Sequence, residues 1–553
     1  MKAILFFYGV FCFISFTSTA QVNPAIKWQN TLGSPGSDIA HSIQQTRDGG
    51  FIVAGNASHN GGGVMGAHGL DDYWIVKLNK NGKAEWGKCY GGTSYDVPWC
   101  VRQTPDNGFI VAGFSSSMDG DVTGHHPVIY EESEDIWILK IDSAGNIQWE
   151  KCYGGSRTDA PHSIEITNDG GYIVVGYTSS TDGDVTNYHG GPYDAWVFKI
   201  DSYGKILWQR TYGGSASEYP NSIIPLSNGE YIFGCVSYSK DGDVTGHHGS
   251  TLFGDAWAVD IDGEGNIIWE KSYGGSGSEG ISSIIQSNDG NFVFVGTGSS
   301  TDGDVTGNHG ASDYWAVKIN DVGQLLNENS FGGSETDGPS SIKPTYDGGF
   351  VIAGQSESHD GQVTGNHSDP GYFDYWIVKL DSNLSLSGEI SMGGSLDEVA
   401  NDIVVTQTNK YIVAGFAESD NGDVIGLHNA SGNNYEDYWI VCLRKNVFET
   451  NAVAYRELNE YEEIQVPLTL SPNLTTGTFQ ITLKAPGNAD QLVDIELLNT
   501  AGQLVLRRQS AMVDGTLRTE IQLNASLPEG IYFVKARINN REFPGKVLLT
   551  RKQ

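Results

Sequence analysis

The residues best suited to chemistry are aspartates and a histidine in a loop that recurs along the chain. One copy, "SSTDGDVTGNHGASDYW" at 299–315, contains Asp302, Asp304 and His309, followed by Asp313. Carboxylate and imidazole groups at this spacing could bind a metal ion or form charge-assisted hydrogen bonds with each other. The number of copies and the elements that position them decide between these roles.

Three groups of this loop region are present in all seven copies. A catalytic group is needed once and not seven times, so we expect structural histidine–carboxylate hydrogen bonds that tie each long loop to its own strand. The histidines are His68, His126, His189, His248, His309, His367 and His428. The acids of a "GGSxxD" turn are Asp38, Asp96, Asp159, Glu218, Glu279, Asp337 and Glu398, and those of a "DxW" segment are Asp72, Asp135, Asp194, Asp255, Asp313, Asp374 and Asp437.

The Asp-Gly-Asp step of the loop leaves calcium as an alternative, because calcium favours several oxygen ligands from a flexible loop. Four copies keep both carboxylates, two keep one, and the first copy has only glycines there; no bidentate Glu follows at the spacing of a helical calcium loop. We therefore expect no cofactor, with calcium as the weaker possibility. The candidate metal ligands are Asp121, Asp184, Asp243 and Asp304.

Irregular copies of the loop are a better indicator of a binding site than the repeated residues. The segments 124–135, 367–374 and 428–437 are longer versions, and they contain aromatic residues beside Glu and Asn. Exposed aromatic rings beside polar groups suit sugar or peptide recognition; the alternative is drift in loop length with the rings packed down. The ligand-binding candidates are Tyr130, Tyr372, Phe373 and Tyr435. No catalytic residue is nominated, since no GxSxG, HExxH or phosphate-binding glycine loop occurs.

These loops belong to a repeat of roughly 58 to 63 residues. Its copies begin near residues 28, 86, 149, 208, 269, 327 and 388. Each unit predicts four strands joined by Asp-Gly and Ser-x-Gly turns, and segments such as "DYWIVKLN" are apolar on both faces. Sheets that need a neighbour on each face, repeated at this period, predict a β-propeller.

The ends of the repeat region predict how the propeller closes. A strand of the fourth type, at 27–32, precedes the first unit, and none follows the last "DYWIVCL". We therefore expect seven blades over 21–445, with the N-terminal strand completing the seventh blade so that no edge stays open.

Composition and the N-terminus indicate an exported protein. The net charge of −34 argues against a nucleic-acid partner. Residues 1–20 resemble a signal peptide, with cleavage expected between Ala20 and Gln21, and no later stretch is apolar enough to span a membrane. The odd number and scatter of the remaining cysteines predict buried free thiols, at Cys89, Cys100, Cys152, Cys235 and Cys442.

After a connector at 446–466, residues 467–553 predict a small immunoglobulin-like β-sandwich. The blocks "LSPNLTTGTFQITL", "VDIELLNTAGQLVLRR", "LPEGIYFVKARI" and "GKVLL" resemble the type A C-terminal sorting domain of type IX secretion in the Bacteroidetes. The usual Pro-Asn-Pro block is Pro472, Asn473 and Leu474 here. The resemblance implies the type IX machinery as a partner, removal of the tail, and release or attachment at the outer-membrane surface.

The repeats also resemble, more loosely, those of secreted bacterial β-propellers, which bears on the fold alone. The prediction is thus an all-β protein, a seven-bladed propeller followed by a sandwich, that serves as a secreted surface binding, adhesion or scaffold protein. Its partner would be a glycan or a surface protein. The alternative is a secreted hydrolase or lyase acting on polysaccharide; the absence of a unique catalytic set favours the non-enzymatic role.

Overall fold

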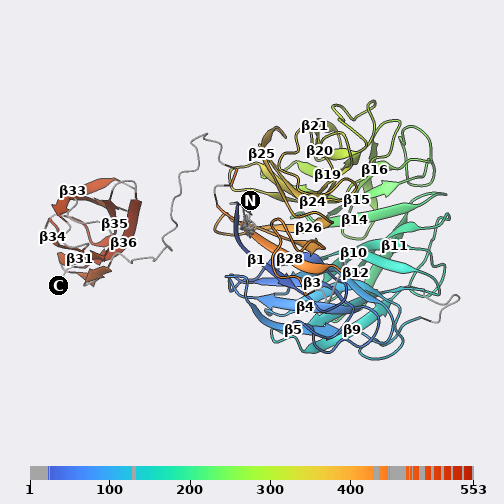
Figure 1. The fold of residues 1–553 in the computed structure, drawn as a ribbon, viewed down its shortest axis with the longest axis horizontal. Coiled ribbons are helices and arrows are strands. Elements are labelled where there is room, and N and C mark those ends of the chain that lie inside the picture. Colours follow the sequence, from blue (N-terminus) through green and yellow to red (C-terminus); the bar gives the residue numbers. More distant parts are fainter. Residues whose placement is uncertain are drawn as a thin grey trace, which may run out of the picture. The chain divides into compact units, whose positions relative to one another are not determined.

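The computed structural model describes residues 23–126, 133–428 and 435–448, apart from 24 and 446. It also describes 469–550, apart from 472–473, 476, 485–491, 500–502, 512–515, 525–526 and 539–540. The chain divides into two compact units, Met1–Thr450 and Asn451–Gln553. All regular elements in the described ranges are β-strands (Figure 1). A helix long and apolar enough to cross a membrane is not found in this described part of the chain.

The first unit consists of repeated four-stranded antiparallel sheets, seven among the described residues. Six of them use four strands consecutive in the chain. The seventh joins three strands from the end of the unit to β1 from its beginning, in the order β1-β28-β27-β26.

The strands are grouped here by their place in a sheet. First strands are β2 (Asp38–Gln45), β6 (Asp96–Gln103), β10 (Asp159–Ile166), β14 (Glu218–Pro225), β18 (Ser283–Gln286), β22 (Asp337–Pro344) and β26 (Glu398–Val405). Second strands are β3 (Phe51–Ala57), β7 (Phe109–Ser115), β11 (Tyr172–Thr178), β15 (Tyr231–Ser237), β19 (Phe292–Gly298), β23 (Phe350–Ser356) and β27 (Tyr411–Ala417). Third strands are β4 (Asp72–Leu78), β8 (Asp135–Ile141), β12 (Asp194–Ile200), β16 (Asp255–Ile261), β20 (Asp313–Ile319), β24 (Asp374–Leu380) and β28 (Asp437–Leu443). Fourth strands are β5 (Ala84–Tyr90), β9 (Ile147–Tyr153), β13 (Ile206–Tyr212), β17 (Ile267–Tyr273), β21 (Leu325–Phe331), β25 (Leu386–Met392) and β1 (Ile26–Leu32).

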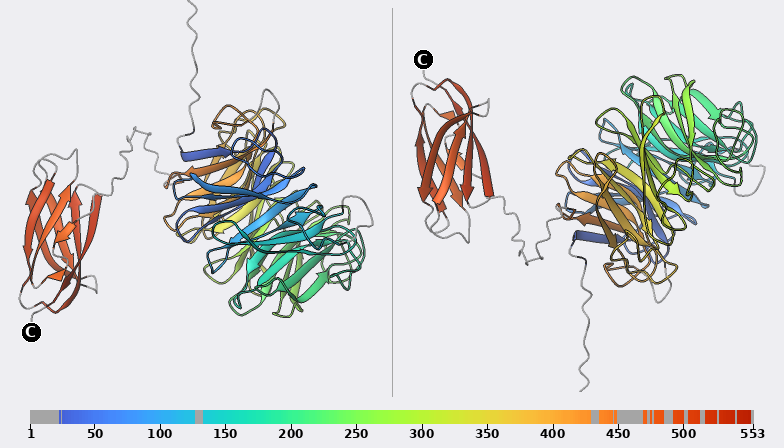
Figure 2. Two further views of the ribbon diagram at one scale, coloured as in Figure 1. Left: turned by 90° about the horizontal axis from the view of Figure 1, so that it is seen from below. Right: turned by 90° about the horizontal axis from the view of Figure 1, so that it is seen from above.

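Neighbouring sheets contact each other mainly through their first strands. Each first strand contacts that of the next sheet in the chain, and β26 of the last sheet contacts β2 of the first. Strand β1 pairs antiparallel with β28, with Trp28 opposite Cys442 and Leu32 opposite Tyr438. The orange strands β26 and β28 accordingly lie beside the blue strands of the first sheet (Figure 1; Figure 2). The arrangement is propeller-like, and its series of contacts returns to its start.

The second and third strands are the most buried part of each sheet because both of their faces meet a neighbouring sheet. All seven residues of β4, β8, β16, β24 and β28 are buried. Tyr438 stacks on Trp74 with ring centroids 4.6 Å apart, and its hydroxyl donates to the carbonyl of Trp74 at 2.9 Å. The same aromatic contact that links other sheets therefore also links the last sheet to the first.

A β-bulge interrupts six of the seven first strands between the third and fifth residues. In β2 the bulge lies between Ala40 and Ser42, so His41 is the extra residue. A bulge bends its strand and turns one side chain away from the regular alternation. The bulged residues line the interior cavity described below.

The described residues of the second unit form eight strands in two sheets. They are β29 (Thr469–Ser471), β30 (Leu474–Thr475), β31 (Thr478–Lys484), β32 (Leu492–Leu498), β33 (Leu504–Ala511), β34 (Thr516–Gln522), β35 (Gly530–Ile538) and β36 (Arg541–Leu549). Sheets β29-β31-β34 and β30-β36-β35-β32-β33 enclose one core that includes Phe479, Ile495 and Val534. Two layers of strands are visible (Figure 2), as in a small β-sandwich.

Some sequence expectations fall at the edges of the described residues. The signal peptide with its cleavage site at Ala20 and Gln21, and most of the connector at 446–466, lie outside them. Within the connector, Phe448 packs on Tyr411 with ring centroids 5.5 Å apart. The first unit therefore extends at least to residue 448, past the expected boundary at 445. The five cysteines named above are free thiols in the structure, and all except Cys152 are buried.

Strand β1 gives a test of how the first unit closes. Deleting residues 23–32 should lower the free energy of unfolding by several kcal/mol, because the edge of β28 is exposed and each lost backbone hydrogen bond contributes about 1 kcal/mol. Calorimetry of the full chain and of the deletion variant measures this. Deletion of 451–553, which removes the separate second unit, should leave the Tm of the first unit unchanged. An unchanged Tm after deletion of 23–32 would contradict a closing role for β1.

Candidate functional site

The long loop between the second and third strands packs on the turn that precedes the first strand of the same sheet. In the second sheet, the backbone N–H of Thr93 donates to Asp119 Oδ1 at 2.8 Å, and that of Asp121 donates to the carbonyl of Gly91 at 2.9 Å. Equivalent bonds form in four other sheets, from Ser156 to Asp182, Ser215 to Asp241, Ser276 to Asp302 and Ser334 to Asp360. The two connections therefore share one face of the unit, which we call the loop rim.

The repeated histidine lies against the aspartate that begins the third strand. His126 Nδ1 is 2.7 Å from Asp135 Oδ2, and the backbone N–H of His126 donates to the same oxygen at 2.8 Å. The corresponding Nδ1 to Oδ2 distances are 3.2 Å for His189, 2.8 Å for His248, 2.6 Å for His309, 3.2 Å for His367 and 2.9 Å for His428. In the first sheet the distance from His68 to Asp72 is longer, 3.6 Å. In six sheets the aspartate thus accepts a bond from the backbone and one from the imidazole of the same histidine, and in the first sheet Asp72 accepts the backbone N–H of His68, so each loop is fixed to its strand.

The two carboxylates of an Asp-Gly-Asp step serve different partners. Asp182 accepts the backbone N–H of Ser156 at 2.8 Å, whereas Asp184 accepts that of Gly154 at 3.4 Å and lies 3.8 Å from His126 Nε2. Asp243 and Asp304 lie similarly, 3.5 Å from His189 and 3.9 Å from His248. Three metal-ligating side chains do not converge anywhere in the part of the chain that the structure describes. The carboxylates therefore act as hydrogen-bond acceptors in this arrangement.

A pair of buried carboxyl groups occupies each junction between consecutive sheets. Asp72 of the first sheet and Asp96 of the second are at most 1% exposed and flank Gly91. A Cβ at Gly91 would lie 2.3 Å from Asp72 Oδ1 and 2.5 Å from Asp96 Oδ2, so only glycine fits between them. Gly33, Gly154, Gly332 and Gly393 are enclosed in the same way by the pairs Asp437 and Asp38, Asp135 and Asp159, Asp313 and Asp337, and Asp374 and Glu398.

Burial of these pairs favours the protonated form of the first-strand acid. Burial, together with the neighbouring Asp437, raises the pKa of Asp38 to about 7. For the same reasons the pKa values are raised to about 6 for Asp96 and Asp337, to about 7 for Asp159 and Glu218, and to about 8 for Glu398. Several partner oxygens, among them Asp72 Oδ1, have no hydrogen-bond donor among the described residues. A proton on one member of a pair relieves the repulsion between the two carboxylates.

The aromatic candidates from the sequence lie at different places in the loop rim. Phe373 is half-buried just before β24, and its backbone N–H donates to Asp397 Oδ1 at 2.9 Å. Tyr372 precedes it and is also half-buried, and Tyr435 occupies the equivalent place before β28 with 38% of its surface exposed. Tyr130 lies outside the described residues. Tyr372 and Phe373 therefore belong to the sixth sheet and Tyr435 to the seventh.

A different set of aromatic rings forms a cluster on the loop rim. Tyr177 has ring centroids 5.0 Å from Tyr193 and 5.7 Å from Tyr219, and Tyr219 lies 6.3 Å from Tyr238. All four are half-buried and come from the third and fourth sheets. We call them the tyrosine cluster. Equivalent positions in other sheets hold residues such as Gln355 and Phe373, so the repeat does not require a tyrosine there.

Acidic side chains occupy other sheets of the same rim. Burial and the charges of Glu436 and Asp397 raise the pKa of Glu418 to about 7. Burial and Glu436 also raise the pKa of Asp397. Glu134 lies near the tyrosine cluster, and burial raises its pKa to about 6. The rim thus combines aromatic rings with carboxyl groups that gain a proton near neutral pH.

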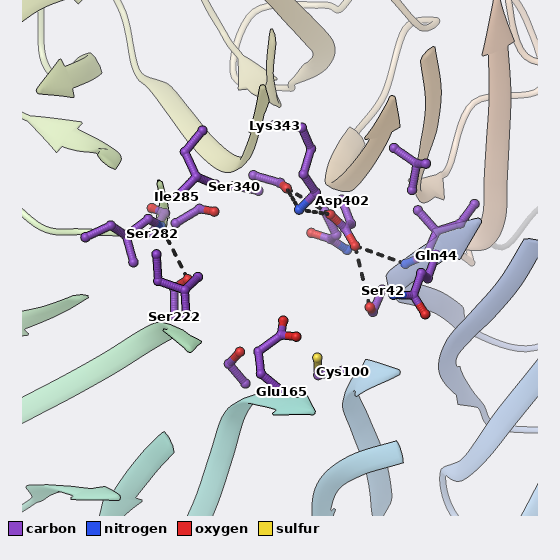
Figure 3. Close-up of a pocket in the computed structure, with 18 of the residues that line it drawn as sticks. Ser42, Gln44, Cys100, Glu165, Ser222, Ser282, Ile285, Ser340, Lys343 and Asp402 are labelled. Carbon is purple, nitrogen blue, oxygen red and sulfur yellow. Dashed lines mark hydrogen bonds and ion pairs between the residues drawn. The ribbon is translucent and has the colours of Figure 1, made fainter. Parts of the chain in front are cut away.

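The interior cavity has a volume of about 740 Å³ and lies among the first strands (Figure 3). Its wall includes the bulged residues His41, Trp99, His162, Asn221, Ser340 and Asn401. Asn288, Thr345 and Tyr346, from the hairpins that join first and second strands, extend the wall to the rim opposite the loops. We call this space the central cavity.

Two ion pairs lie in the wall of the central cavity. Arg102 contacts Glu165 Oε1 through Nε at 2.7 Å and through Nη2 at 2.6 Å. Lys343 Nζ lies 3.2 Å from Asp402 Oδ1, an oxygen that also accepts the hydroxyl of Ser341 at 2.8 Å (Figure 3). Burial alone would raise the pKa of Asp402, but Lys343 and Arg102 hold it below its usual value. Each charge in the wall is therefore matched by a partner.

An aromatic row connects the central cavity to the tyrosine cluster. His41 lies 4.6 Å from Trp99, Trp99 lies 5.3 Å from His162, and His162 lies 5.7 Å from Tyr177, measured between ring centroids. Burial lowers the pKa of His41 to about 4 and lowers that of His162, so both imidazoles are neutral at pH 7. Sequence reasoning missed this row and the cavity wall. A comparison of the seven first strands position by position could have found them, because these positions vary where their neighbours repeat.

The carboxyl pairs make stability depend on pH. A folded-state pKa above the unfolded value means that the native state binds the proton more tightly, so the stability that these acids contribute is fully present at low pH and is lost as pH rises from about 4 to 8. Each such group contributes at most about 1.4 kcal/mol per pH unit. Urea unfolding across this range should show the fall, and Glu398→Gln should reduce its slope. The exposed Glu335→Gln is the control. Stability that is constant or rises with pH would contradict this account.

Removal of divalent cations gives a separate test of the loops. Since the Asp-Gly-Asp carboxylates accept protein hydrogen bonds, excess chelator should leave the Tm of the first unit unchanged. Replacing the histidine partner is the positive control: Asp135→Asn should lower the free energy of unfolding by about 1–3 kcal/mol, because a charge-assisted bond is weakened. A Tm that falls in chelator and recovers with added calcium would show that the loops bind the ion.

Known proteins show limited similarity to this chain outside the family model reported below. The regulatory protein FlaEY of Caulobacter vibrioides is 25% identical over 224 residues, which cover 37% of this chain and 22% of that protein. The chain thus spans about a fifth of this curated relative. PorZ, a surface component of the type IX secretion system of Porphyromonas gingivalis, has 11% identity and a TM-score of 0.35, over 92% of this chain and 59% of PorZ. A member of the DUF4221 family from Bacteroides vulgatus has 10% identity and a TM-score of 0.33, over 76% and 97%.

The second unit gives a clear match. Residues 469–550 match the family model described as a secretion system C-terminal sorting domain. This confirms the resemblance seen in the four C-terminal sequence blocks. Such a tail implies export by type IX secretion to the cell surface or the exterior. The C-terminal unit of this chain is therefore a type IX sorting domain.

Proposed function

We propose that the first unit is a seven-bladed β-propeller that binds carbohydrate outside the cell through its loop rim. Support for the blade number comes from the seven four-stranded sheets and from the contact between β26 and β2. Support for binding comes from departures from the repeat on that rim. The sorting domain would deliver this rim to the exterior, where extracellular glycans are available.

The tyrosine cluster is the observation that carries the proposal. Tyr177, Tyr193, Tyr219 and Tyr238 are each half-buried, so part of every ring faces solvent. Tyrosine offers an apolar ring face for a sugar ring and a hydroxyl for its polar groups. Because other sheets have different residues at these positions, packing of the propeller does not explain why four tyrosines occur here. Phe373, Tyr372 and Tyr435 on other sheets, and Tyr130 outside the described residues, remain candidates for further contacts.

The repeated histidines have a structural role in this proposal. Each one joins its loop to a buried aspartate, as His126 joins Asp135. A rim of fixed loops presents its aromatic rings in a defined geometry, which reduces the entropy lost on binding. Calcium is not needed for this role, and Asp121, Asp184, Asp243 and Asp304 act as hydrogen-bond acceptors.

A second candidate function is cleavage of polysaccharide. Glu134 carries a pKa raised to about 6 beside the tyrosine cluster, which suits a general acid near neutral pH. Glycoside hydrolysis needs a second carboxylate at a defined separation across the bond. Asp159 also has a raised pKa and its backbone N–H bonds to the carbonyl of Glu134, but its side chain is fully buried. Glu418, another rim acid with a raised pKa, stands on the seventh sheet, whereas Glu134 stands on the second. Binding is therefore the better-supported function.

A glycan array with the full chain tests the proposal. The double substitution Tyr177→Ala with Tyr219→Ala should weaken binding of a retained glycan by about tenfold or more, since stacking contributes about 0.5–1.5 kcal/mol per ring beyond burial. Tyr203→Ala is the matched control, because Tyr203 is a 78% exposed tyrosine in the turn between β12 and β13. Equal binding by the double variant and the control would contradict the rim site.

Product analysis on retained glycans separates the two functions. Released sugar that disappears in Glu134→Gln, with binding preserved, would show an enzyme. Unchanged glycan after long incubation supports a binding module. Thermal unfolding of each variant should accompany both measurements, so that loss of fold is not read as loss of function.

A further inference from the structure

We propose that the central cavity is a second binding site, separate from the loop rim, for a neutral polyhydroxylated molecule the size of a monosaccharide. Such a ligand would enter from the rim formed by the hairpins between first and second strands. The proposal does not depend on the tyrosine cluster, because the cavity wall uses other residues.

The first argument is that the cavity wall breaks the repeat. In every sheet a buried acid at or just before the first strand and a buried Ile or Val within that strand recur, as in Asp38 with Ile43 and Asp96 with Val101. The bulged position between them instead varies between histidine, tryptophan, asparagine and serine. The position three residues further along varies as well, from Arg102 and Glu165 to Ile224. Variation confined to the cavity wall is not required by the packing of sheets on one another.

The second argument is the supply of hydroxyl groups. The first-strand position directly after the bulge is a serine in five sheets: Ser42, Ser163, Ser222, Ser283 and Ser341. Ser282 and Ser340 add two more hydroxyls to the wall, from the fifth and sixth sheets (Figure 3). Within the described residues, no hydrogen bond engages the hydroxyls of Ser163, Ser282 or Ser340. Each can donate one bond and accept others, which matches the needs of a sugar hydroxyl.

The third argument concerns charge. The four charged side chains that face this space form two ion pairs, Arg102 with Glu165 and Lys343 with Asp402. The two imidazoles of the wall, His41 and His162, each contact an asparagine, Asn56 at 3.0 Å and Asn221 at 2.7 Å. A charged ligand would meet charges that are already paired, so it would gain little attraction to offset the loss of its own hydration. A neutral ligand avoids this cost.

The fourth argument is shape. Trp99 lies half-buried in the wall between His41 and His162, with ring centroids 4.6 and 5.3 Å away. Ile224 and Ile285 form an apolar part of the wall on the fourth and fifth sheets. Sugars present apolar C–H faces and polar edges, and this wall offers an indole, two isoleucines and hydroxyls. A volume of about 740 Å³ falls within the range of about 300–1,000 Å³ usual for small-molecule sites.

Calorimetric titration of the full chain with single neutral sugars tests the proposal. The probes are glucose, galactose, mannose and N-acetylglucosamine, and we expect at least one to bind with a Kd below about 1 mM. Glucuronate and glucosamine, which carry charge, should bind at least about tenfold more weakly than the matching neutral sugar. Absence of heat for all four neutral sugars, or tighter binding of a charged one, would overturn the assignment.

Two kinds of variant test whether the sugar binds in the central cavity or on the loop rim. Ser282→Leu fills the wall with an apolar side chain and should abolish binding; if it fails to fold, Ser340→Leu replaces it, with circular dichroism and Tm as the check of folding. The double variant Tyr177→Ala with Tyr219→Ala should keep the affinity for the single sugar, even where it loses glycan binding on the array. Retained affinity in a folded serine variant, or loss in the tyrosine variant, would move the sugar to the loop rim and refute a second site.

Discussion

Each four-stranded sheet of the first unit has two apolar faces, and this constraint governs the rest of the structure. Leaving an apolar face exposed to water costs a free energy of about 25 cal/mol per Å² of surface, so each sheet needs a neighbour on both sides. A row of such sheets would leave its first and last faces open. Contact between β26 and β2, with β1 completing the last sheet, leaves no terminal face in the series. The burial of Trp74 beneath Tyr438 shows that the closing junction is packed like the others.

Tight packing at the junctions also determines where charge is buried. The third strand of one sheet and the first strand of the next both begin with an acid, and the glycine between them leaves no room for a side chain. Such a pair would repel if both members were ionised in a low-dielectric interior. The histidine of the loop, hydrogen bonds from neighbouring backbone, and a proton on the first-strand acid reduce this repulsion. Each described loop is therefore tied to its strand for an electrostatic reason.

Much of this architecture could be predicted from the sequence. A strand or contact pattern that is weak in one unit becomes reliable when it recurs in every unit. The strand at 27–32 could be placed by counting fourth strands, and the structure has β1 at Ile26–Leu32 paired with β28. Proximity of His126 to Asp135 followed from their recurrence in every unit. The tyrosine cluster did not follow, since Tyr177 and Tyr219 lie 42 positions apart on two sheets whose mutual rotation no local pattern gives. The bulge also could not be predicted. In a regular strand His41 and Ser42 would point to opposite faces, and both line the cavity only because the bulge shifts the register between Ala40 and Ser42.

Repetition and its exceptions thus carry different information in a protein of this kind. A residue that recurs at equivalent positions satisfies a requirement that every sheet shares, such as a junction acid or a third-strand tryptophan. A residue that occurs on one or two sheets, such as Trp99 or Tyr219, breaks a local symmetry that packing alone would preserve. A single site for one ligand needs residues that differ between sheets, whereas a site repeated on every sheet does not. The loop rim differs between sheets through tyrosines on two adjacent sheets. The wall of the central cavity differs between sheets because it has aromatic residues on one side, isoleucines on another, and several serines.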